Sequence, residues 1–209
     1  RHRGGHRRAA GGVVAIDRST LSRNSTAGDD SPGGAIDSLS VVIRQSEIAE
    51  NITDGTRASG AGIMADSLTL TDSLVANNLA RGSESSGGGF SARQATVTGS
   101  TISGNTATMT GGGLNVESAL ITASTIALNQ ADIGGGVHLS DSASASLTMN
   151  NSIAATNVSQ SDAPDLFIPA NPIGAISASF NLIGDHAGSQ LAESQVPDSR
   201  GNLIGSVAG

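Results

Sequence analysis

The side chains that could perform acid–base chemistry are spread thinly along this sequence. It contains 18 carboxylates, 11 basic residues that are all Arg, and four His. Cleavage of a polysaccharide needs two or three carboxylates on one face, with a cation to stabilise the developing charge. We assign Asp17 and Asp72 to one position of a repeated pattern, with Arg44 and Gly99 at that position nearby. A polysaccharide lyase or glycoside hydrolase is therefore the enzymatic interpretation of the chain, and it is the alternative to the non-catalytic role that the repeats favour below.

Other kinds of catalytic or metal chemistry have less support. The chain has no Cys, which excludes thiol chemistry, disulfides and Cys-ligated metals. Asp29 and Asp30 lie in a turn-rich stretch, but Ca²⁺ takes six to eight oxygen ligands and the Gly-Gly-x-Gly-x-Asp repeat is absent. We expect a solvated loop there, and we assign no catalytic residue, metal or cofactor.

A tandem repeat determines where all these side chains must lie. The hexapeptide Ser100–Asn105, with the sequence Ser-Thr-Ile-Ser-Gly-Asn, recurs in variant form along most of the chain. Its copies end at Asn24, Asn51, Asn78, Asn105, Asn129 and Asn157. Subtracting successive positions gives intervals of 27, 27, 27, 24 and 28 residues. A constant period in this range indicates a repeat architecture.

The repeats differ in length at a predicted loop. Glycine-rich triplets such as Gly111–Gly113 recur with a similar period. An apolar residue directly follows each triplet, and in four repeats it lies 10 residues before the first Ser of the next hexapeptide. In the fifth repeat this distance, from Val137 to Ser152, is 15. The extra residues fall in Ser140–Ser146. We predict a polar loop there that leaves the neighbouring strands in place, because insertions collect in loops over a rigid frame.

Short strands account for the apolar residues within each repeat. Leu68 and Leu70 flank a Thr, an alternation that is typical of half-buried strands, and no window carries a helical period. Several strands per unit predict an all-β fold, a right-handed parallel β-helix of about seven coils of 24–28 residues, spaced about 4.8 Å apart. One inward stack is expected to contain Ile48, Val75, Ile102 and Ile126.

The repeated Asn residues are predicted to form a structural ladder. An Asn at each corner can hydrogen-bond to the Asn one coil away, and so satisfy polar groups that the turn would otherwise bury without partners. The glycine triplets suit corners where φ is positive or where backbones crowd together. Because this role explains the period, we assign the six Asn to structure rather than to a ligand site.

Charge and composition divide the chain into three segments: a basic segment at residues 1–8, regular repeats at 9–157, and divergent coils at 158–209. In the last segment Asn181 and Asn202 follow Asn157 at intervals of 24 and 21 residues, which predicts further coils. No polar cap follows them. We therefore expect this end to be cut off, or covered by a partner or by further domains of a longer chain.

The basic segment contains Arg1, Arg3, Arg7 and Arg8 within a chain of net charge −7. Clustered Arg can bind nucleic acid, but we expect a solvated terminus and no nucleic-acid partner. The far end carries acids instead: Asp165, Asp185, Glu193 and Asp198. Opposite charge at two open strand edges predicts head-to-tail self-association into filaments. No apolar run is long enough for a membrane helix, and no secretion signal is visible.

The Ser-Thr-Ile-Ser-Gly-Asn and Gly-Gly-Gly-Leu repeats, which end in Phe180–Gly184 and Gly201–Gly205, resemble a group of large bacterial surface proteins. These are right-handed parallel β-helices, above all those with polymorphic outer-membrane-protein-type repeats and those that carry a CSLREA motif. The resemblance covers nearly the whole chain and is specific for fold rather than activity. It implies a secreted or cell-surface protein, structural or adhesive, with Ser- and Thr-rich faces open to glycans or cell surfaces. The CSLREA segment and an autotransporter barrel are absent here.

Overall fold

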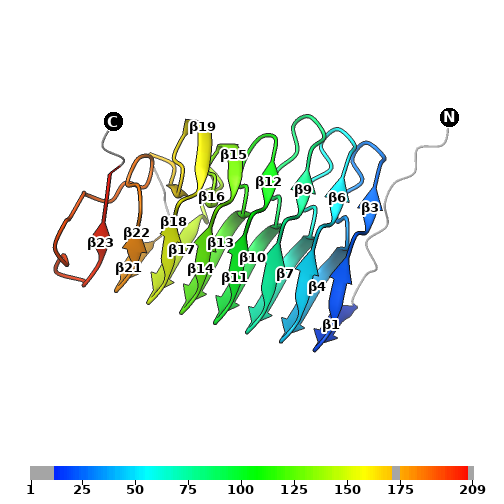
Figure 1. Cartoon of the computed structure of the whole chain (residues 1–209), viewed down its shortest axis with the longest axis horizontal. Coiled ribbons are helices and arrows are strands. Elements are labelled where there is room, and N and C mark those ends of the chain that lie inside the picture. The colour runs from blue at the N-terminus through cyan, green and yellow to red at the C-terminus, as the bar shows by residue number, and fades with distance from the viewer. Residues whose placement is uncertain (1–11, 171–174, 207–209) are drawn as a thin grey trace.

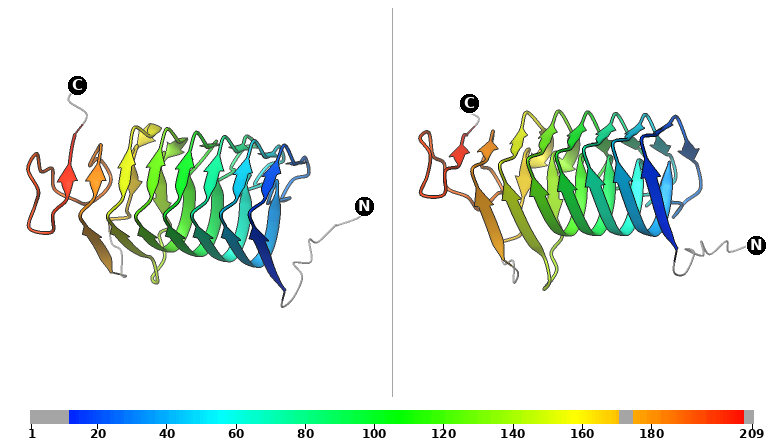
Figure 2. Two further views of the ribbon diagram at one scale, coloured as in Figure 1. Left: turned by 60° about the horizontal axis from the view of Figure 1, so that its bottom comes forward. Right: turned by 90° about the horizontal axis from the view of Figure 1, so that it is seen from below.

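A computed structural model describes residues 12–170 and 175–206 as a parallel β-solenoid, whose coils are stacked along the long axis (Figures 1 and 2). The all-β fold class is confirmed. The described residues contain no helix that could cross a membrane. The basic segment with Arg1, Arg3, Arg7 and Arg8 lies outside the described residues.

The strands form three sheets, A, B and C, that run along the axis. Sheet A contains β1 (Val13–Asp17), β4 (Ile36–Arg44), β7 (Ile63–Thr71), β10 (Phe90–Thr98), β13 (Leu114–Thr122), β16 (Val137–Leu139), β17 (Ser146–Asn150), β20 (Leu166–Phe167) and β21 (Ile176–Ser179). Sheet B contains β2 (Thr20–Ser22), β5 (Glu47–Ala49), β8 (Leu74–Ala76), β11 (Thr101–Ser103), β14 (Thr125–Ala127), β18 (Ile153–Ala155), β22 (Leu182–Ile183) and β23 (Leu203–Ile204). Sheet C contains β3 (Ser25–Thr26), β6 (Ile52–Thr53), β9 (Leu79–Ala80), β12 (Thr106–Ala107), β15 (Gln130–Ile133) and β19 (Val158–Asp162).

The solenoid has about six coils rather than the seven predicted. Within the described residues, sheet C has six strands, so six coils contribute to all three sheets, and β20 to β23 extend only sheets A and B. The spacing of Asn181 and Asn202 after Asn157 predicted further, divergent coils. The register of β22 on β18 instead places Asn181 beside Ser152, at a different corner from the other Asn residues.

The core is a narrow column of aliphatic side chains that point inward from the stacked strands. Parallel pairing aligns Ile48 with Val75, Val75 with Ile102, and Ile102 with Ile126. All four side chains are fully buried, which confirms the predicted stack. Each coil buries its apolar face against its neighbours, as a solenoid repeat must.

The predicted insertion loop is also confirmed. The single strand β13 pairs with β16 through Leu114–Val116 and with β17 through Ser118–Thr122. The nine-residue strand of the earlier coils is therefore divided in two in this coil, and residues 140–145 leave the sheet between the two halves. The register is the same on both sides of the loop.

The end of sheet B has a cap that the sequence did not predict. The backbone N–H of Ser194 donates to the carbonyl oxygen of Ile204 at 2.8 Å, and the N–H of Ile204 donates back at 3.0 Å. This antiparallel bridge covers the edge of β23. Asp198 Oδ1 also accepts the backbone N–H groups of Arg200 and Asn202, both at 2.8 Å. The expectation of an uncapped end is therefore not met at sheet B.

Candidate functional site

The repeated Asn residues form one hydrogen-bonded ladder at the corner between sheets B and C. The backbone N–H and the side-chain Nδ2 of Asn78 both donate to Oδ1 of Asn105, at 3.0 and 2.9 Å. Nδ2 of Asn78 also donates to the carbonyl oxygen of Ile48 at 2.9 Å. The same link joins successive members of the series Asn24, Asn51, Asn78, Asn105, Asn129 and Asn157. These groups hold adjacent coils together, so their role is structural.

A second ladder, made of Ser, lies at the corner between sheets A and B. The backbone N–H of Ser46 donates to Oγ of Ser73 at 3.1 Å, and Oγ of Ser46 donates to the carbonyl oxygen of Arg44 at 2.6 Å. The ladder contains Ser19, Ser46, Ser73, Ser100, Ser124 and Ser152. Asn181 and Asn202 continue the Ser ladder beyond Ser152, rather than the Asn ladder.

The chain turns this corner through residues in the left-handed backbone conformation. Arg18, Gln45 and Asp72 have φ values of 44°, 45° and 46°, which non-glycine residues rarely adopt. Left-handed residues direct the following Ser inward and turn their own side chains outward. In the next coil Gly99 takes this position, with φ of 60°.

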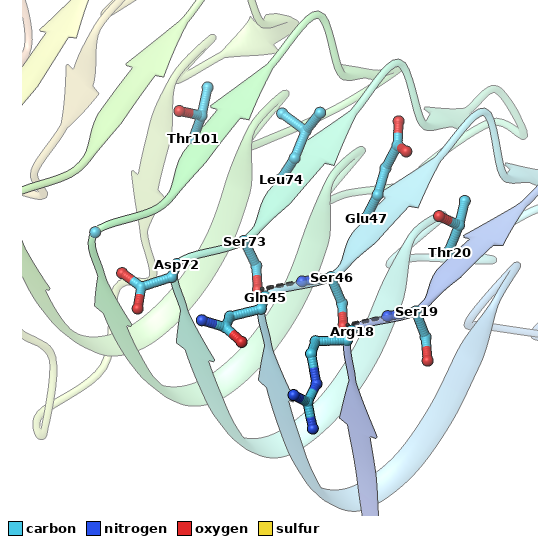
Figure 3. Close-up of a pocket in the computed structure, with 11 residues that line it drawn as sticks. Arg18, Ser19, Thr20, Gln45, Ser46, Glu47, Asp72, Ser73, Leu74 and Thr101 are labelled. Carbon is cyan, nitrogen blue, oxygen red and sulfur yellow. Dashed lines mark hydrogen bonds between the residues drawn. The ribbon is translucent and has the colours of Figure 1, made fainter.

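A groove of about 850 Å³ follows this corner across the first coils (Figure 3). The Ser ladder forms its floor. One wall carries the outward side chains of Arg18, Gln45 and Asp72, and the other carries the first residues of the sheet B strands. Those first residues are Thr20, Glu47, Leu74 and Thr101. The groove is open along its length.

The charges of the groove change along the axis. The guanidinium of Arg18 pairs with the neighbouring Asp17 carboxylate at 2.9 Å, and both side chains are exposed. Glu47 and Asp72 place carboxylates in the following coils. A Cβ on Gly99 would lie 2.4 Å from Oδ1 of Asp72, so the absence of a side chain there makes room for the Asp72 carboxylate.

The predicted pairing of Asp17 with Asp72 is wrong by one residue. Strand register places Asp17 beside Arg44, and Arg44 beside Thr71. Asp72 belongs to the next column, with Arg18 and Gln45, outside the strand. A single step along a strand end separates a side chain on the sheet from one on the corner. The repeat period already shows this offset, because Asp17 lies seven residues before Asn24 whereas Asp72 lies six residues before Asn78.

The groove offers polar contacts rather than an evident catalytic set. No group of three or more His, Asp or Glu that could hold a metal occurs in the described parts of the chain. His138 lies elsewhere, on sheet A, where it stacks on Phe167 with ring centroids 4.8 Å apart and contacts Oδ1 of Asn115 at 2.8 Å. Burial lowers the pKa of His138 to about 4, so its imidazole is neutral at physiological pH.

Comparison of the chain with family models, with curated proteins and with solved structures gives no match.

Proposed function

We propose that this chain is a non-catalytic structural or adhesive module, exposed outside a bacterial cell, that binds glycans along the groove between sheets A and B. The observation that carries the proposal is the groove itself, which presents exposed amide, hydroxyl and carboxylate groups in successive coils. Such groups can hydrogen-bond to the hydroxyls of an extended sugar chain that lies parallel to the axis.

The rigidity of the groove supports a binding role. The floor of the groove is fixed by hydrogen bonds from each Ser to the next, and the strands of sheets A and B on its two sides pair with their neighbours in register. A ligand therefore meets side chains whose backbone is already ordered, and binding does not have to order it. The extracellular location is proposed from the resemblance of the repeats to those of bacterial surface proteins.

Head-to-tail self-association is not part of the proposal. Asp165, one of the acids expected to guide it, is 1% exposed and hydrogen-bonded inside the chain. The bridge between Ser194 and Ile204 also occupies the sheet B edge that a second copy would need.

A panel of neutral and acidic polysaccharides, immobilised and probed with the purified chain, tests the glycan proposal. We expect retention of the wild type and a several-fold loss for Asp72→Ala. Asn77→Ala is the matched control. The side chain of Asn77 lies against Gly104 at the corner between sheets B and C, just as the side chain of Asp72 lies against Gly99 at the groove, but Asn77 does not line the groove. Retention that is equal in both variants, or no retention at all, would contradict the proposal.

The same panel examines the enzymatic alternative. Release of reducing or unsaturated ends that disappears in Asp72→Ala or Glu47→Ala would establish a hydrolase or lyase in place of the adhesive module. Unchanged polysaccharide after prolonged incubation is the result we expect.

A further inference from the structure

The outer face of sheet A, next to the groove, carries a regular array of side chains that mostly bear hydroxyl groups. In the C-terminal halves of β7, β10 and β13, and in β17 and β21, every second residue points outward. Parallel pairing aligns these residues in two columns. The first column contains Thr69, Thr96, Leu120, Thr148 and Ser177. The second contains Thr71, Thr98, Thr122, Asn150 and Ser179. We call these ten residues the threonine face.

The ten residues of the threonine face are uncharged, although the chain as a whole has a net charge of −7. The second column becomes charged in the two preceding coils, at Arg44 and Asp17. The column beside it is also uncharged and contains Ser67, Gln94, Ser118 and Ser146. Within the described residues, the hydroxyls of the six Thr make no hydrogen bond to another protein group. These hydroxyls are available to a partner that offers hydrogen bonds and no charge.

The array is ordered in two directions. Neighbouring coils place equivalent residues about 4.8 Å apart along the axis, and outward residues on one strand lie about 6.6 Å apart. No register shift interrupts sheet A between β7 and β21. Threonine is β-branched and stiff at χ1, so its hydroxyl and methyl groups hold nearly fixed positions. A single polymer strand would not match this order in both directions, whereas a crystalline surface would.

We propose that the threonine face binds ice. Ice is uncharged, its oxygen atoms accept and donate hydrogen bonds, and rows of these atoms repeat at a spacing close to that between neighbouring coils. The Thr hydroxyls can join the outermost water layer while the methyl groups between them order the adjacent water. Because the side chains are already fixed, little conformational entropy is lost on contact.

A crystalline polysaccharide is the competing solid, and the side chains present favour it less. Sugar rings pack well against aromatic faces, but the chain has no Trp or Tyr. Of its three Phe, Phe90 is fully buried and Phe167 stacks on His138. Phe180 is exposed but directly follows β21, at the edge of the array.

Two substitutions in one coil provide the test. Thr122→Arg places a long charged side chain on the threonine face, and Thr125→Arg places the same side chain on the outer surface of sheet B. Both Thr are partly exposed and lie in adjacent strands of that coil. Circular dichroism and thermal melts of both variants establish that the solenoid is folded.

The readouts are the gap between melting and freezing temperatures of single ice crystals and the inhibition of ice recrystallisation. We expect both activities in the wild type and in Thr125→Arg, with loss of nearly all activity in Thr122→Arg. No activity in the wild type, or equal loss in folded forms of both variants, would overturn the proposal. So would pelleting with microcrystalline cellulose or chitin without any effect on ice. Asp72→Ala leaves this face unchanged, so failure of the glycan proposal is distinguished from failure here.

Discussion

The side-chain Nδ2 of Asn157 lies 2.7 Å from Oδ1 of Asp165, and this hydrogen bond ends the Asn ladder. The backbone N–H of Asn157 donates to the same oxygen at 3.1 Å, while Oδ2 accepts the N–H of Asp185 at 2.7 Å. Asp165 is only 1% exposed. A buried carboxylate thus takes the acceptor role that the next Asn would have in a regular coil.

The first prediction concerns the pH dependence that Asp165 contributes. Burial raises the pKa of Asp165 above its ordinary value of 3.8, and the hydrogen bonds from Asn157 and Asp185 offset part of this effect. The folded state therefore holds the proton more tightly than the unfolded state does. The group's contribution to stability is greatest below the ordinary pKa and falls as pH rises through the folded pKa.

Asp165→Asn removes this titration. The unfolding free energy of the variant minus that of the wild type should therefore increase with pH from about 3 to about 7, as measured by urea unfolding. Asp198→Asn is the control of opposite sign, because hydrogen bonds from Asn202 lower the pKa of Asp198. Its difference from the wild type should decrease over the same range. Parallel pH curves for wild type and Asp165→Asn would contradict this assignment.

The second prediction is that Asn105→Ala destabilises the fold by about 2–4 kcal/mol. The change removes the acceptor of the Asn78 backbone N–H and the donor to the carbonyl oxygen of Val75, both of which are buried. Asn24→Ala, at the exposed start of the ladder, should cost less than about 1 kcal/mol. Urea unfolding measures the loss of unfolding free energy in both variants. Similar losses would show that the contribution of a ladder Asn to stability does not depend on its burial.

The third prediction is that Thr53→Val stabilises the protein by about 1 kcal/mol. Oγ1 of Thr53 is buried and has no hydrogen-bond partner among the described residues, and valine has nearly the same shape. Thr26→Val, one coil earlier, should instead destabilise, because Oγ1 of Thr26 donates to the carbonyl oxygen of Ser31 at 3.0 Å. Thermal melts that shift in the same direction for both variants would disagree with this prediction.

The fourth prediction is that Ile102→Asp prevents folding, with a loss above about 4 kcal/mol. Ile102 is fully buried between Val75 and Ile126, so an Asp would bury an unpaired charge. Circular dichroism should show loss of the β signal. Ile102→Val keeps the stack apolar and should cost about 0.5–1.5 kcal/mol. A soluble, β-rich Ile102→Asp chain would exclude this packing.

The interior of the solenoid could be predicted because the period fixes both strand position and strand face. Ile102 and Val75 occupy one position in consecutive repeats, and side-chain alternation directs both inward. The insertion at residues 140–145 was predictable for the same reason, since repeats of constant length surround it.

The ends and corners could not be predicted in the same way. Asp165 lies between β19 and β20, one coil after Gly136 and in register with it. The sequence has no glycine triplet there, so the repeat pattern did not reveal that Asp165 meets Asn157. Asn181 resembles a ladder Asn, but its Oδ1 can accept a backbone N–H equally well at the Ser corner. The threonine face was not predicted, because polar residues at alternate positions are expected on the solvent side of any half-buried strand.

Every link of the Asn ladder runs in one direction, with Nδ2 towards the next coil and Oδ1 towards the previous one. Aligned side-chain amides add their dipoles as aligned peptide groups do in a helix, and hydrogen bonds in such a chain polarise one another. The column is therefore a small electrical dipole, with its positive end at Asn157 and its negative end at Asn24. Asp165 places a carboxylate at the positive end, so the orientation of six neutral amides helps to hold a negative charge in a dry interior.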